Sequence, residues 1–446
     1  MTTRITLAAV LLAAFTASTA QTIVIAALPT LAREFGVSGT SAAWALTAFM
    51  LAAAVATPIA GSLGDMFGYR RISVVCLGFC DVGLLLCAPA ESFPLLLAGR
   101  ALAGVSGGVF PLAFGLVRRA VSPARLPGVV ALLSAMFGIG GAAGMLAAGP
   151  LLGTFGRAWL FWPLLVLGVA ALFLAFLLPT DQGTAGGRVD VAGAVLLAGA
   201  LVALLLGISQ AKAWGAGPAA GLFAVAAVLS VAFAAAELRG SRRWPWAPNR
   251  RRMPLSAPRP LVDLRLLGRR PVAVTNVTTV VAAAAMFGVV TLIPRLVAEN
   301  RVAVALAPMV AVMLVATPLA PRLGGRVSVR AGAVFAIAAC MMLAFAHDAL
   351  WQVCVAGALL GMGYGRAFAA FGTLVVDAVE ARDTGVATGV NTIARTAGGA
   401  IGAQVAAALV TGASYGPAFT VFALVAVAAL AVTSALPRRS PVLSAI

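Results

Sequence analysis

Residues 61–71 read GSLGDMFGYRR, and this short stretch decides how the sequence around it is interpreted. It is rich in glycine and charged at Asp65, Arg70 and Arg71. On both sides lie apolar runs of roughly the 20 residues that a membrane-spanning helix needs. Because glycine permits tight turns, the stretch predicts a short turn between two spanning helices.

The same alternation of apolar runs and short polar links continues along the chain. Of 446 residues, 62% are hydrophobic and only 10% charged, and the mean hydropathy is +1.05. Soluble domains are about half apolar and a quarter charged, so the composition belongs to the membrane class. The run at the N-terminus resembles a signal peptide, but it continues to Leu28 and is long enough to span. The runs predict an all-α membrane protein with about fourteen transmembrane helices, at 5–29, 41–63, 73–90, 94–117, 128–152, 158–179, 191–210, 218–237, 271–294, 302–320, 330–346, 350–375, 385–411 and 415–435.

The basic residues set the expected orientation in the cell membrane. An even number of spans puts both termini on one side, and links rich in Lys and Arg face the cytoplasm. Most of the 31 Lys and Arg residues fall in links on the side of the termini, which we therefore predict to be cytoplasmic. The exceptions are five residues in outer links (Arg33, Arg157, Lys212, Arg295 and Arg301) and three inside spans (Arg100, Arg366 and Arg395).

The link at 239–270 is the most basic part of the chain and also carries several prolines. Basic links next to membrane spans attract anionic lipid headgroups. The net charge of +18 is thus explained by topology and lipid, and we expect no nucleic-acid partner. A regulatory or partner-binding role of this link remains open beside the role of an anchor.

The second half of the sequence repeats features of the first. ATPIAGSLG at 56–64 matches ATPLAPRLG at 316–324, and AFG at 113–115 matches AFG at 370–372. The matches predict two related six-helix halves around a midplane cavity, which is how rocking transporters are built. We expect the following divisions: an N-terminal half at 1–180, inserted helices 7 and 8 at 181–238, the basic cytoplasmic link at 239–270, a C-terminal half at 271–436 and a cytoplasmic tail at 437–446.

The turn at residues 61–71 resembles the helix 2–3 signature of the major facilitator superfamily. The resemblance implies that Asp65 and Arg70 latch one conformation at the cytoplasmic seam between the halves, within a motif that also includes Gly61, Gly68 and Arg71. A plain tight turn is the alternative. The position equivalent to Asp65 in the second half is Gly325, so we expect a one-sided latch.

Two further motifs resemble the same superfamily. LLAGRALAG at 96–104 is similar to its buried-arginine motif, which implies that Arg100 takes part in proton coupling; a structural arginine that snorkels is the alternative. The fifth predicted helix is similar to the Gly-Pro antiporter motif of exporters, although simple helix packing is an alternative for any single glycine. The residues in question are Gly141, Gly144, Gly149, Pro150 and Gly153.

Three other stretches resemble the fourteen-helix drug:proton antiporters of the QacA/EmrB type: TIVIAALP at 22–29, DVAG at 190–193 and the region from Thr384 to Gly399. That branch usually carries an aspartate two residues before the helix 1 threonine, where this chain has Ala20. The one carboxylate predicted near the bilayer centre is Asp81, at a depth similar to that of Arg100. We expect Asp81 to serve as the proton-titrating partner of Arg100, or else to face another helix as a structural polar group.

Embedded cations bear on the substrate. Arg366, Asn391 and Arg395 are the candidate residues of the substrate cavity, although the depth of Arg366 also suits a gate or a snorkelling side chain. Three embedded arginines against one aspartate favour a neutral or acidic substrate over a lipophilic cation.

We therefore expect a secondary active exporter of small amphiphilic molecules, a drug or natural product, that is proton-coupled and works by alternating access as a monomer. An uptake porter or uniporter on the same scaffold, or a non-transporting membrane sensor, remains open. We expect no enzyme, cofactor or metal site, because no phosphate-binding Gly-x-x-x-x-Gly-Lys motif is present and the lone His347 lacks catalytic partners in the sequence.

Overall fold

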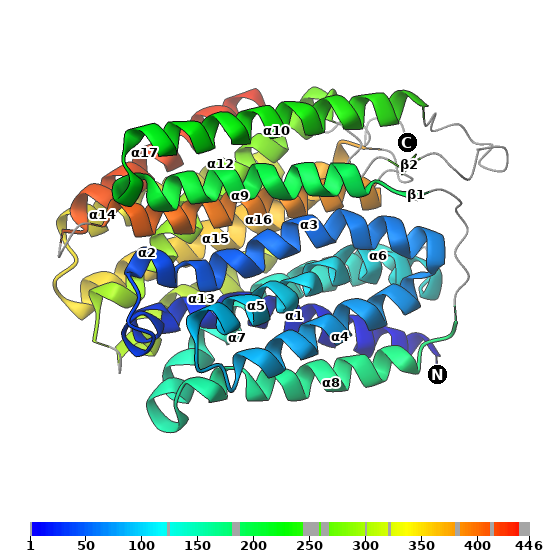
Figure 1. Ribbon diagram of the computed structural model, residues 1–446, viewed down its shortest axis with the longest axis horizontal. Helices are drawn as coiled ribbons and strands as arrows, with labels where there is room; N and C mark the ends of the chain where they lie inside the picture. The colour runs from blue at the N-terminus through cyan, green and yellow to red at the C-terminus, as the bar shows by residue number, and fades with distance from the viewer. Residues whose placement is uncertain are drawn as a thin grey trace.

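The computed structural model of the protein describes residues 2–122, 125–180, 188–243, 258–259, 267–298, 301–319, 323–379, 384–410 and 414–436. Almost all of these residues are helical, and the helices run side by side along the long axis of an elongated bundle (Figure 1). The predicted all-α fold is therefore confirmed.

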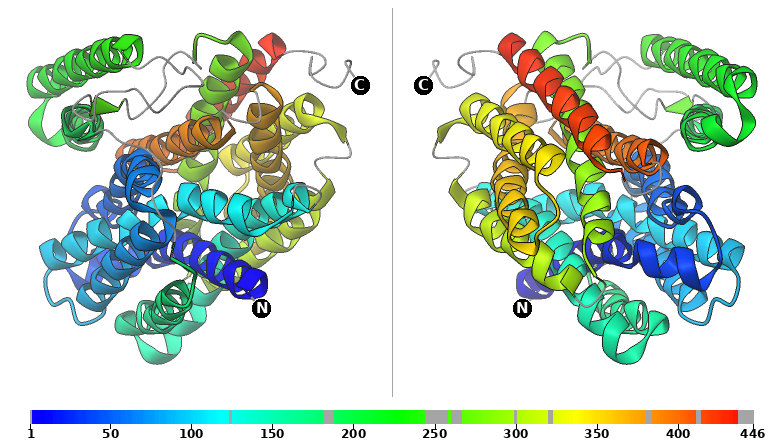
Figure 2. Two further views of the ribbon diagram at one scale, coloured as in Figure 1. Left: turned by 90° about the vertical axis from the view of Figure 1, so that its right-hand side faces the viewer. Right: turned by 90° about the vertical axis from the view of Figure 1, so that its left-hand side faces the viewer.

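The helices gather largely into two groups, which Figure 2 shows in end view. The N-terminal group contains α1 (Thr2–Glu34), α2 (Gly39–Ala42), α3 (Trp44–Phe67), α4 (Tyr69–Cys87), α5 (Phe93–Gly104), α6 (Val109–Ala120), α7 (Leu126–Phe155) and α8 (Trp162–Phe176). The C-terminal group contains α12 (Arg270–Leu296), α13 (Val302–Leu319), α14 (Gly325–Phe345), α15 (Leu350–Asp377), α16 (Thr384–Leu409) and α17 (Gly416–Val432). Short 3₁₀ segments lie at Val105–Gly108, Arg157–Leu160 and Thr433–Ala435.

Two long helices, α9 (Val191–Trp214) and α10 (Ala216–Arg243), lie at the side of the bundle and pack on each other. Of the two, α9 reaches α3 and α16. Near them, β1 (Arg188–Val189) and β2 (Pro258–Arg259) form one parallel pair with Arg188 opposite Pro258. Most of the basic link at 239–270 and the whole tail at 437–446 lie outside the described residues.

The number of helices also agrees with the sequence. When α2 is counted with α3, and α5 with α6, the described residues form fourteen helical rods. Eleven helices in the described part are long and apolar enough to cross a membrane by length and composition. Such a chain is a multi-pass membrane protein.

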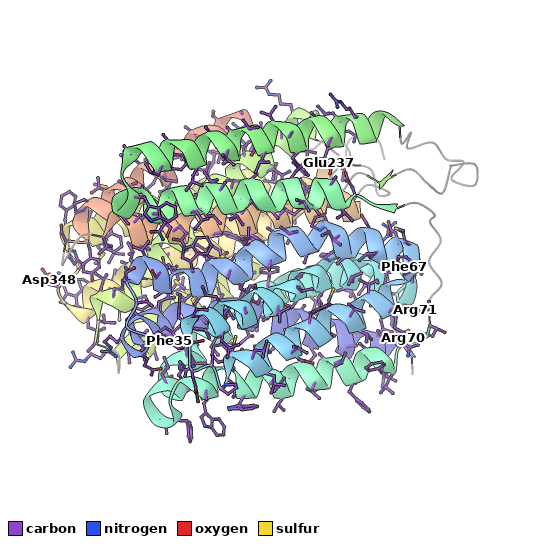
Figure 3. The ribbon with its side chains drawn as sticks, viewed as in Figure 1. Phe35, Phe67, Arg70, Arg71, Glu237 and Asp348 are labelled. Atoms are coloured by element: carbon purple, nitrogen blue, oxygen red, sulfur yellow. The ribbon has the colours of Figure 1, made fainter. Side chains whose placement is uncertain are left out.

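Successive rods alternate in direction, so the bundle has two ends. Phe67, Arg70 and Arg71 lie near the chain N-terminus at one end, whereas Phe35 and Asp348 lie at the other (Figure 3). We call the end that carries Phe35 the distal end. The turn between α3 and α4 is made by Gly68, whose φ of +98° is a conformation that favours glycine.

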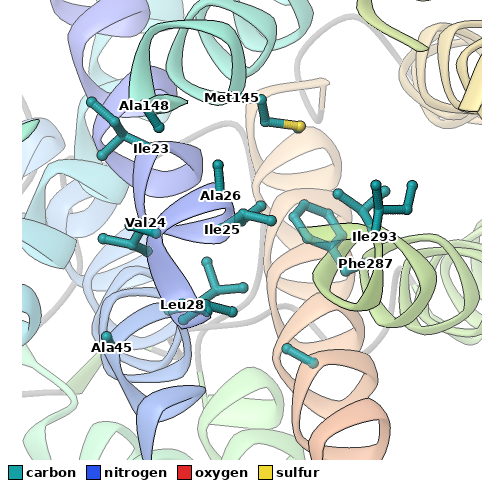
Figure 4. Packing of buried hydrophobic residues seen from close by; sticks show 14 of the residues in the cluster. Ile23, Val24, Ile25, Ala26, Leu28, Ala45, Met145, Ala148, Phe287 and Ile293 are labelled. Atoms are coloured by element: carbon teal, nitrogen blue, oxygen red, sulfur yellow. The ribbon is translucent and has the colours of Figure 1, made fainter. Parts of the chain in front are cut away.

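The largest apolar core joins the two groups of helices. Ile25, Ala26 and Leu28 of α1 point toward Phe287 and Ile293 of α12, whereas Val24 points the other way (Figure 4). Ala148 of α7 lies beside Ile23. Because small side chains such as Ala26 and Ala148 line this contact, the backbones approach closely. The core thus packs the two groups together over the distal part of the bundle.

Candidate functional site

A cluster of one cation and several aromatic rings lies where the two groups of helices meet. The guanidinium carbon of Arg395, on α16, lies 3.4 Å from the ring centroid of Phe137 on α7 and 5.8 Å from that of Phe368 on α15. A guanidinium over an aromatic face is an attractive cation–π contact, stronger where water is excluded. Arg395 therefore links the N-terminal group to the C-terminal group through an aromatic ring.

The rings continue on both sides of this cation. Phe368 stacks on Tyr364 with centroids 4.4 Å apart and an interplanar angle of 7°. Tyr364 contacts Phe287 edge to face at 5.7 Å, and Phe110 lies 4.2 Å from Phe137. These rings were not predicted from the sequence, although Tyr364 and Phe368 stand four residues apart and so share one helix face. Together they form an aromatic surface with one half-buried positive charge, suited to planar amphiphilic molecules.

The other two predicted cavity residues lie elsewhere. Asn391 donates hydrogen bonds to Asn276 Oδ1 (3.2 Å) and Thr279 Oγ1 (2.9 Å), both on α12. The guanidinium of Arg366 lies 6.0 Å from the ring of Phe335 on α14. Residues two apart on a helix point about 200° apart, so Arg366 faces away from the side of α15 that carries Tyr364. Among the three predicted residues, Arg395 alone contacts the aromatic cluster within the described part of the chain.

Arg100 is completely buried and is held by backbone carbonyl groups. Its Nε donates to the oxygen of Ala45 on α3, and Nη1 to the oxygen of Ala20 on α1, each at 2.7 Å, with a longer bond from Nη2 to Gln21. Its guanidinium also lies 4.7 Å from the ring centroid of Phe49. An arginine in mid-membrane costs about 2.5 to 3.5 kcal/mol on insertion scales. Hydrogen bonds from a charged donor, worth roughly 1.5 to 3 kcal/mol each, offset that cost.

The predicted pairing of Asp81 with Arg100 is wrong. Asp81 is 7% exposed, and among the described residues neither of its carboxylate oxygens has a hydrogen-bond partner. Its Oδ1 lies against Gly168 of α8, where any added side chain would overlap it. The face of α4 that meets α5 carries Gly83 and Cys87 instead, and Asp81 lies off that stripe because each residue turns the helix by about 100°. Thus α4 directs its carboxylate to α8, not to α5.

The residues of the turn between α3 and α4 make contacts within the N-terminal group. Tyr69 donates a hydrogen bond to Asp65, and Arg70 donates one of 2.5 Å to the carbonyl oxygen of Phe176 at the end of α8. The ring of Tyr69 packs against Gly64 and Gly115, where a Cβ would come too close. These glycines therefore make room for Tyr69.

The remaining residues of this motif have simpler surroundings. Gly61 faces Pro111 of α6, whose Cβ would lie 3.7 Å from a Cβ at Gly61. Arg71 is exposed. In this structure the described contacts of the motif fix the ends of α3, α4 and α8 to one another.

The glycines of α7 make two different close approaches. A Cβ at Gly144 would lie 2.7 Å from the oxygen of Thr19 on α1, and Thr22 Oγ1 donates a bond of 2.8 Å to the carbonyl oxygen of Gly141. Gly149 faces Ala303 of α13 in the other group, with a Cβ distance of 2.9 Å. Pro150 and Gly153 are exposed instead. Gly141, Gly144 and Gly149 of this motif therefore mediate helix packing, whereas Pro150 and Gly153 do not.

A polar contact across the seam was missed by the sequence analysis. Gln404 of α16 is fully buried and donates a hydrogen bond of 2.9 Å to Thr47 Oγ1 on α3. A glutamine inside the apolar run at 385–411 was the signal that could have indicated it.

Comparison with known proteins identifies the family. The model of the Major Facilitator Superfamily matches residues 10–191, 186–403 and 302–445, which cover most of the chain. The chain belongs to the Major Facilitator Superfamily. It is accordingly a transporter-family protein and not an enzyme.

Several curated members of the superfamily are similar in sequence. A multidrug resistance protein B homolog of Mycobacterium tuberculosis is 32% identical over 280 residues, which cover 61% of this chain and 48% of that protein. The tetracenomycin C resistance and export protein of Streptomyces glaucescens is 29% identical over 406 residues, covering 86% of this chain and 71% of that protein. A puromycin resistance protein of Streptomyces alboniger is 34% identical over 223 residues, covering 49% and 44%. The chain thus spans about half the length of the first of these relatives.

Solved structures agree with the fold. A human organic anion transporter superposes with a TM-score of 0.66 at 16% identity, covering 97% of this chain and 100% of that chain. The POT family transporter PepTSo superposes with a TM-score of 0.68 at 15% identity, covering 96% of this chain and 97% of that chain. At such identities the likeness concerns the fold alone.

Proposed function

We propose that this major facilitator protein is a secondary active exporter of small amphiphilic molecules, a drug or a natural product. It works by alternating access, is coupled to protons, and belongs to the fourteen-helix drug:proton antiporter branch of the QacA/EmrB type. The names of the relatives support export, since they are called multidrug resistance, tetracenomycin C export and puromycin resistance proteins.

The observation that carries this proposal is the cluster around Arg395. Its cation and rings come from α7 of one group and α12, α15 and α16 of the other, so a molecule bound there touches both. Aromatic faces bind planar apolar rings, and a half-buried guanidinium favours a neutral or acidic substituent. The cluster therefore supports a planar, neutral or acidic substrate.

For alternating access, the two groups of helices act as two related six-helix halves, at 1–180 and 271–436. The segment 181–238 is inserted between them. The turns that precede α4 and α14 support this relation, because each uses a glycine with positive φ, Gly68 at +98° and Gly324 at +79°. In a rocking mechanism the distal contacts between the groups break when the site opens there. We place the distal end outside and both termini in the cytoplasm, with the link at 239–270 on anionic lipid.

For proton coupling, Asp81 alone is the group that binds and releases the proton. Arg100 is a positioning residue. A buried carboxylate without a hydrogen-bond partner is costly while charged. Its protonation is therefore sensitive to any movement of α8 that changes its surroundings. Because Arg100 binds carbonyl groups of α1 and α3, it holds α5 in a fixed relation to both.

Drug susceptibility tests this proposal. A bacterial host without its own major exporters expresses the chain or the variants Arg395→Gln and Phe137→Leu at matched levels. We expect wild type to raise the inhibitory concentration of tetracenomycin C or puromycin several-fold, to lose this effect with a protonophore, and to give little protection against the cation ethidium. Both variants lose protection. Increased accumulation of the drugs, or unchanged susceptibility across a wide panel of antibiotics, would contradict export.

A further inference from the structure

A cavity lies at the distal end of the bundle, separate from the Arg395 cluster. It has a volume of about 920 Å³ and is lined from both helix groups, by the end of α1, by α2, by the end of α12 and by α16 with Tyr415. This volume lies within the roughly 300 to 1,000 Å³ of small-molecule pockets. The cavity can therefore hold a molecule of drug size.

Two arginines give this cavity its charge. Arg33 and Arg295 are among its lining residues, together with the hydroxyl groups of Ser38, Thr40 and Tyr415. None of the described lining residues carries a carboxylate. Arg295 itself has no carboxylate partner among the described residues, and the nearby Glu34 is paired with Arg157 at 2.9 Å. Arg295 thus gives the cavity a positive charge. The hydroxyl groups of Ser38, Thr40 and Tyr415 already donate hydrogen bonds to other protein groups.

Arg295 is held in place from both sides of the seam. Its Nη2 donates a bond of 2.9 Å to the carbonyl oxygen of Gly39, and a Cβ at Gly39 would lie 3.1 Å from the same nitrogen. On the other side, the hydroxyl of Tyr415 donates a bond of 3.3 Å to the backbone oxygen of Arg295. A guanidinium has five N–H donors, so most remain for a ligand after the bond to Gly39. A fixed, planar guanidinium suits bidentate binding of a carboxylate.

We infer that this distal cavity is a binding site for a small organic anion, a carboxylate or a deprotonated phenol, on the exit side of the transporter. The inference rests on the proposed function for the direction of passage, whereas the binding itself does not. The anionic group contacts Arg295, and the apolar body lies against Leu28, Pro29 and Pro294. Because the cavity spans the seam, an occupant touches both groups there.

Dye binding to the purified full chain tests the site. The protein is placed in nanodiscs of zwitterionic phosphatidylcholine at pH 8, and fluorescence anisotropy follows fluorescein, an anion, and rhodamine 123, a cation on the same ring system. We expect fluorescein to bind, Arg295→Gln to weaken binding about tenfold, and rhodamine 123 to bind no better than to empty nanodiscs. Arg33→Gln, a change at an exposed side chain that leaves the fold intact, also weakens binding.

Matched controls separate this site from others. Arg301→Gln removes an exposed arginine at the same end that does not line the cavity, and binding stays unchanged. Arg395→Gln removes only the share of fluorescein binding that the Arg395 cluster contributes.

Several outcomes overturn the inference. They are absence of fluorescein binding, binding unchanged by both Arg295→Gln and Arg33→Gln, or binding lost only in Arg395→Gln. Displacement of fluorescein by millimolar phosphate, or by phosphatidylglycerol in the nanodisc, would assign the site to inorganic anions or lipid headgroups and likewise overturn it. Binding of fluorescein requires no transport. A failed export test would therefore contradict the proposed function without contradicting the distal binding site.

Discussion

The Nη1 group of Arg100 on α5 donates a hydrogen bond of 2.7 Å to the carbonyl oxygen of Ala20 on α1. Ala20 occupies the position at which the resemblance to drug:proton antiporters leads one to expect an aspartate. In this chain, backbone dipoles and the face of Phe49 stabilise the buried arginine in place of an acid. The carboxylate predicted near the bilayer centre, Asp81 of α4, lies against Gly168 of α8 instead.

Substitution of Arg100 tests its structural role. A lysine cannot present the fork of donors that reaches α1 and α3 together. We expect Arg100→Lys to lose at least one charged hydrogen bond, about 2 kcal/mol, and Arg100→Gln to lose more. Thermal unfolding in detergent measures both variants against Arg71→Lys, a change at an exposed arginine that leaves the melting temperature unaltered. An Arg100→Gln variant with an unchanged melting temperature would contradict a structural role of Arg100.

Asp81→Asn tests the titrating group. Asparagine has nearly the same shape and stays neutral, so we expect the variant to fold and to exchange substrate for substrate, while losing uphill transport driven by a pH gradient. The matched control is Glu91→Gln, at an exposed carboxylate in the connection between α4 and α5, which keeps pH-driven transport. An Asp81→Asn variant with unchanged pH dependence would rule out this aspartate.

Gly168→Ala tests the contact between α8 and Asp81. The new methyl group overlaps Asp81 Oδ1, so the carboxylate must move; overpacking of this kind costs roughly 1 to 3 kcal/mol. By contrast, Gly153 has no atom within 4 Å of an added Cβ, and Gly153→Ala gains up to about 1 kcal/mol from helix propensity. We expect opposite shifts in melting temperature and a loss of coupling in Gly168→Ala alone. Equal behaviour of the two variants would mean that α8 does not confine Asp81.

Removal of the hydrogen bond between Gln404 and Thr47 tests whether it holds the two groups of helices together at the distal end. A buried neutral bond contributes about 1 kcal/mol, which is close to a fivefold change in an equilibrium. We expect Thr47→Val or Gln404→Leu to raise the rate of thiol labelling at Ser38→Cys, in the distal cavity, by about that factor, with no further increase in the double variant. Additive effects of the two substitutions would show that the bond does not couple the groups.

The sequence predicted the course of the chain better than the direction of its side chains. Apolar runs and glycine-rich turns depend on local composition, so the helices and the turn at Gly68 were found correctly. The depth of a residue in the membrane depends on its position along its own helix, and this can be counted from the sequence. Asp81 and Arg100 were therefore placed at similar depths. Rotation about the helix axis is set by packing with neighbours, and a single residue changes the facing by about 100°.

Contacts between distant segments were the second kind of feature that the sequence could not supply. Phe137 and Arg395 are separated by most of the chain, and no local pattern marks them as partners. Arg395 was found because a charge inside an apolar span is rare, whereas a phenylalanine there is ordinary. Gln404 was detectable on the same ground as Arg395, but its partner Thr47 was not.

Lumenal pH in proteoliposomes is the most direct test of proton-coupled export. Vesicles with an acidic lumen contain the protein and the dye pyranine, and a compound that the chain exports from cells is added outside. We predict that the compound accumulates inside and that the lumenal pH rises with it in wild type, with neither change in Asp81→Asn. Accumulation without any rise in lumenal pH, or an equal rise in Asp81→Asn, would contradict the account.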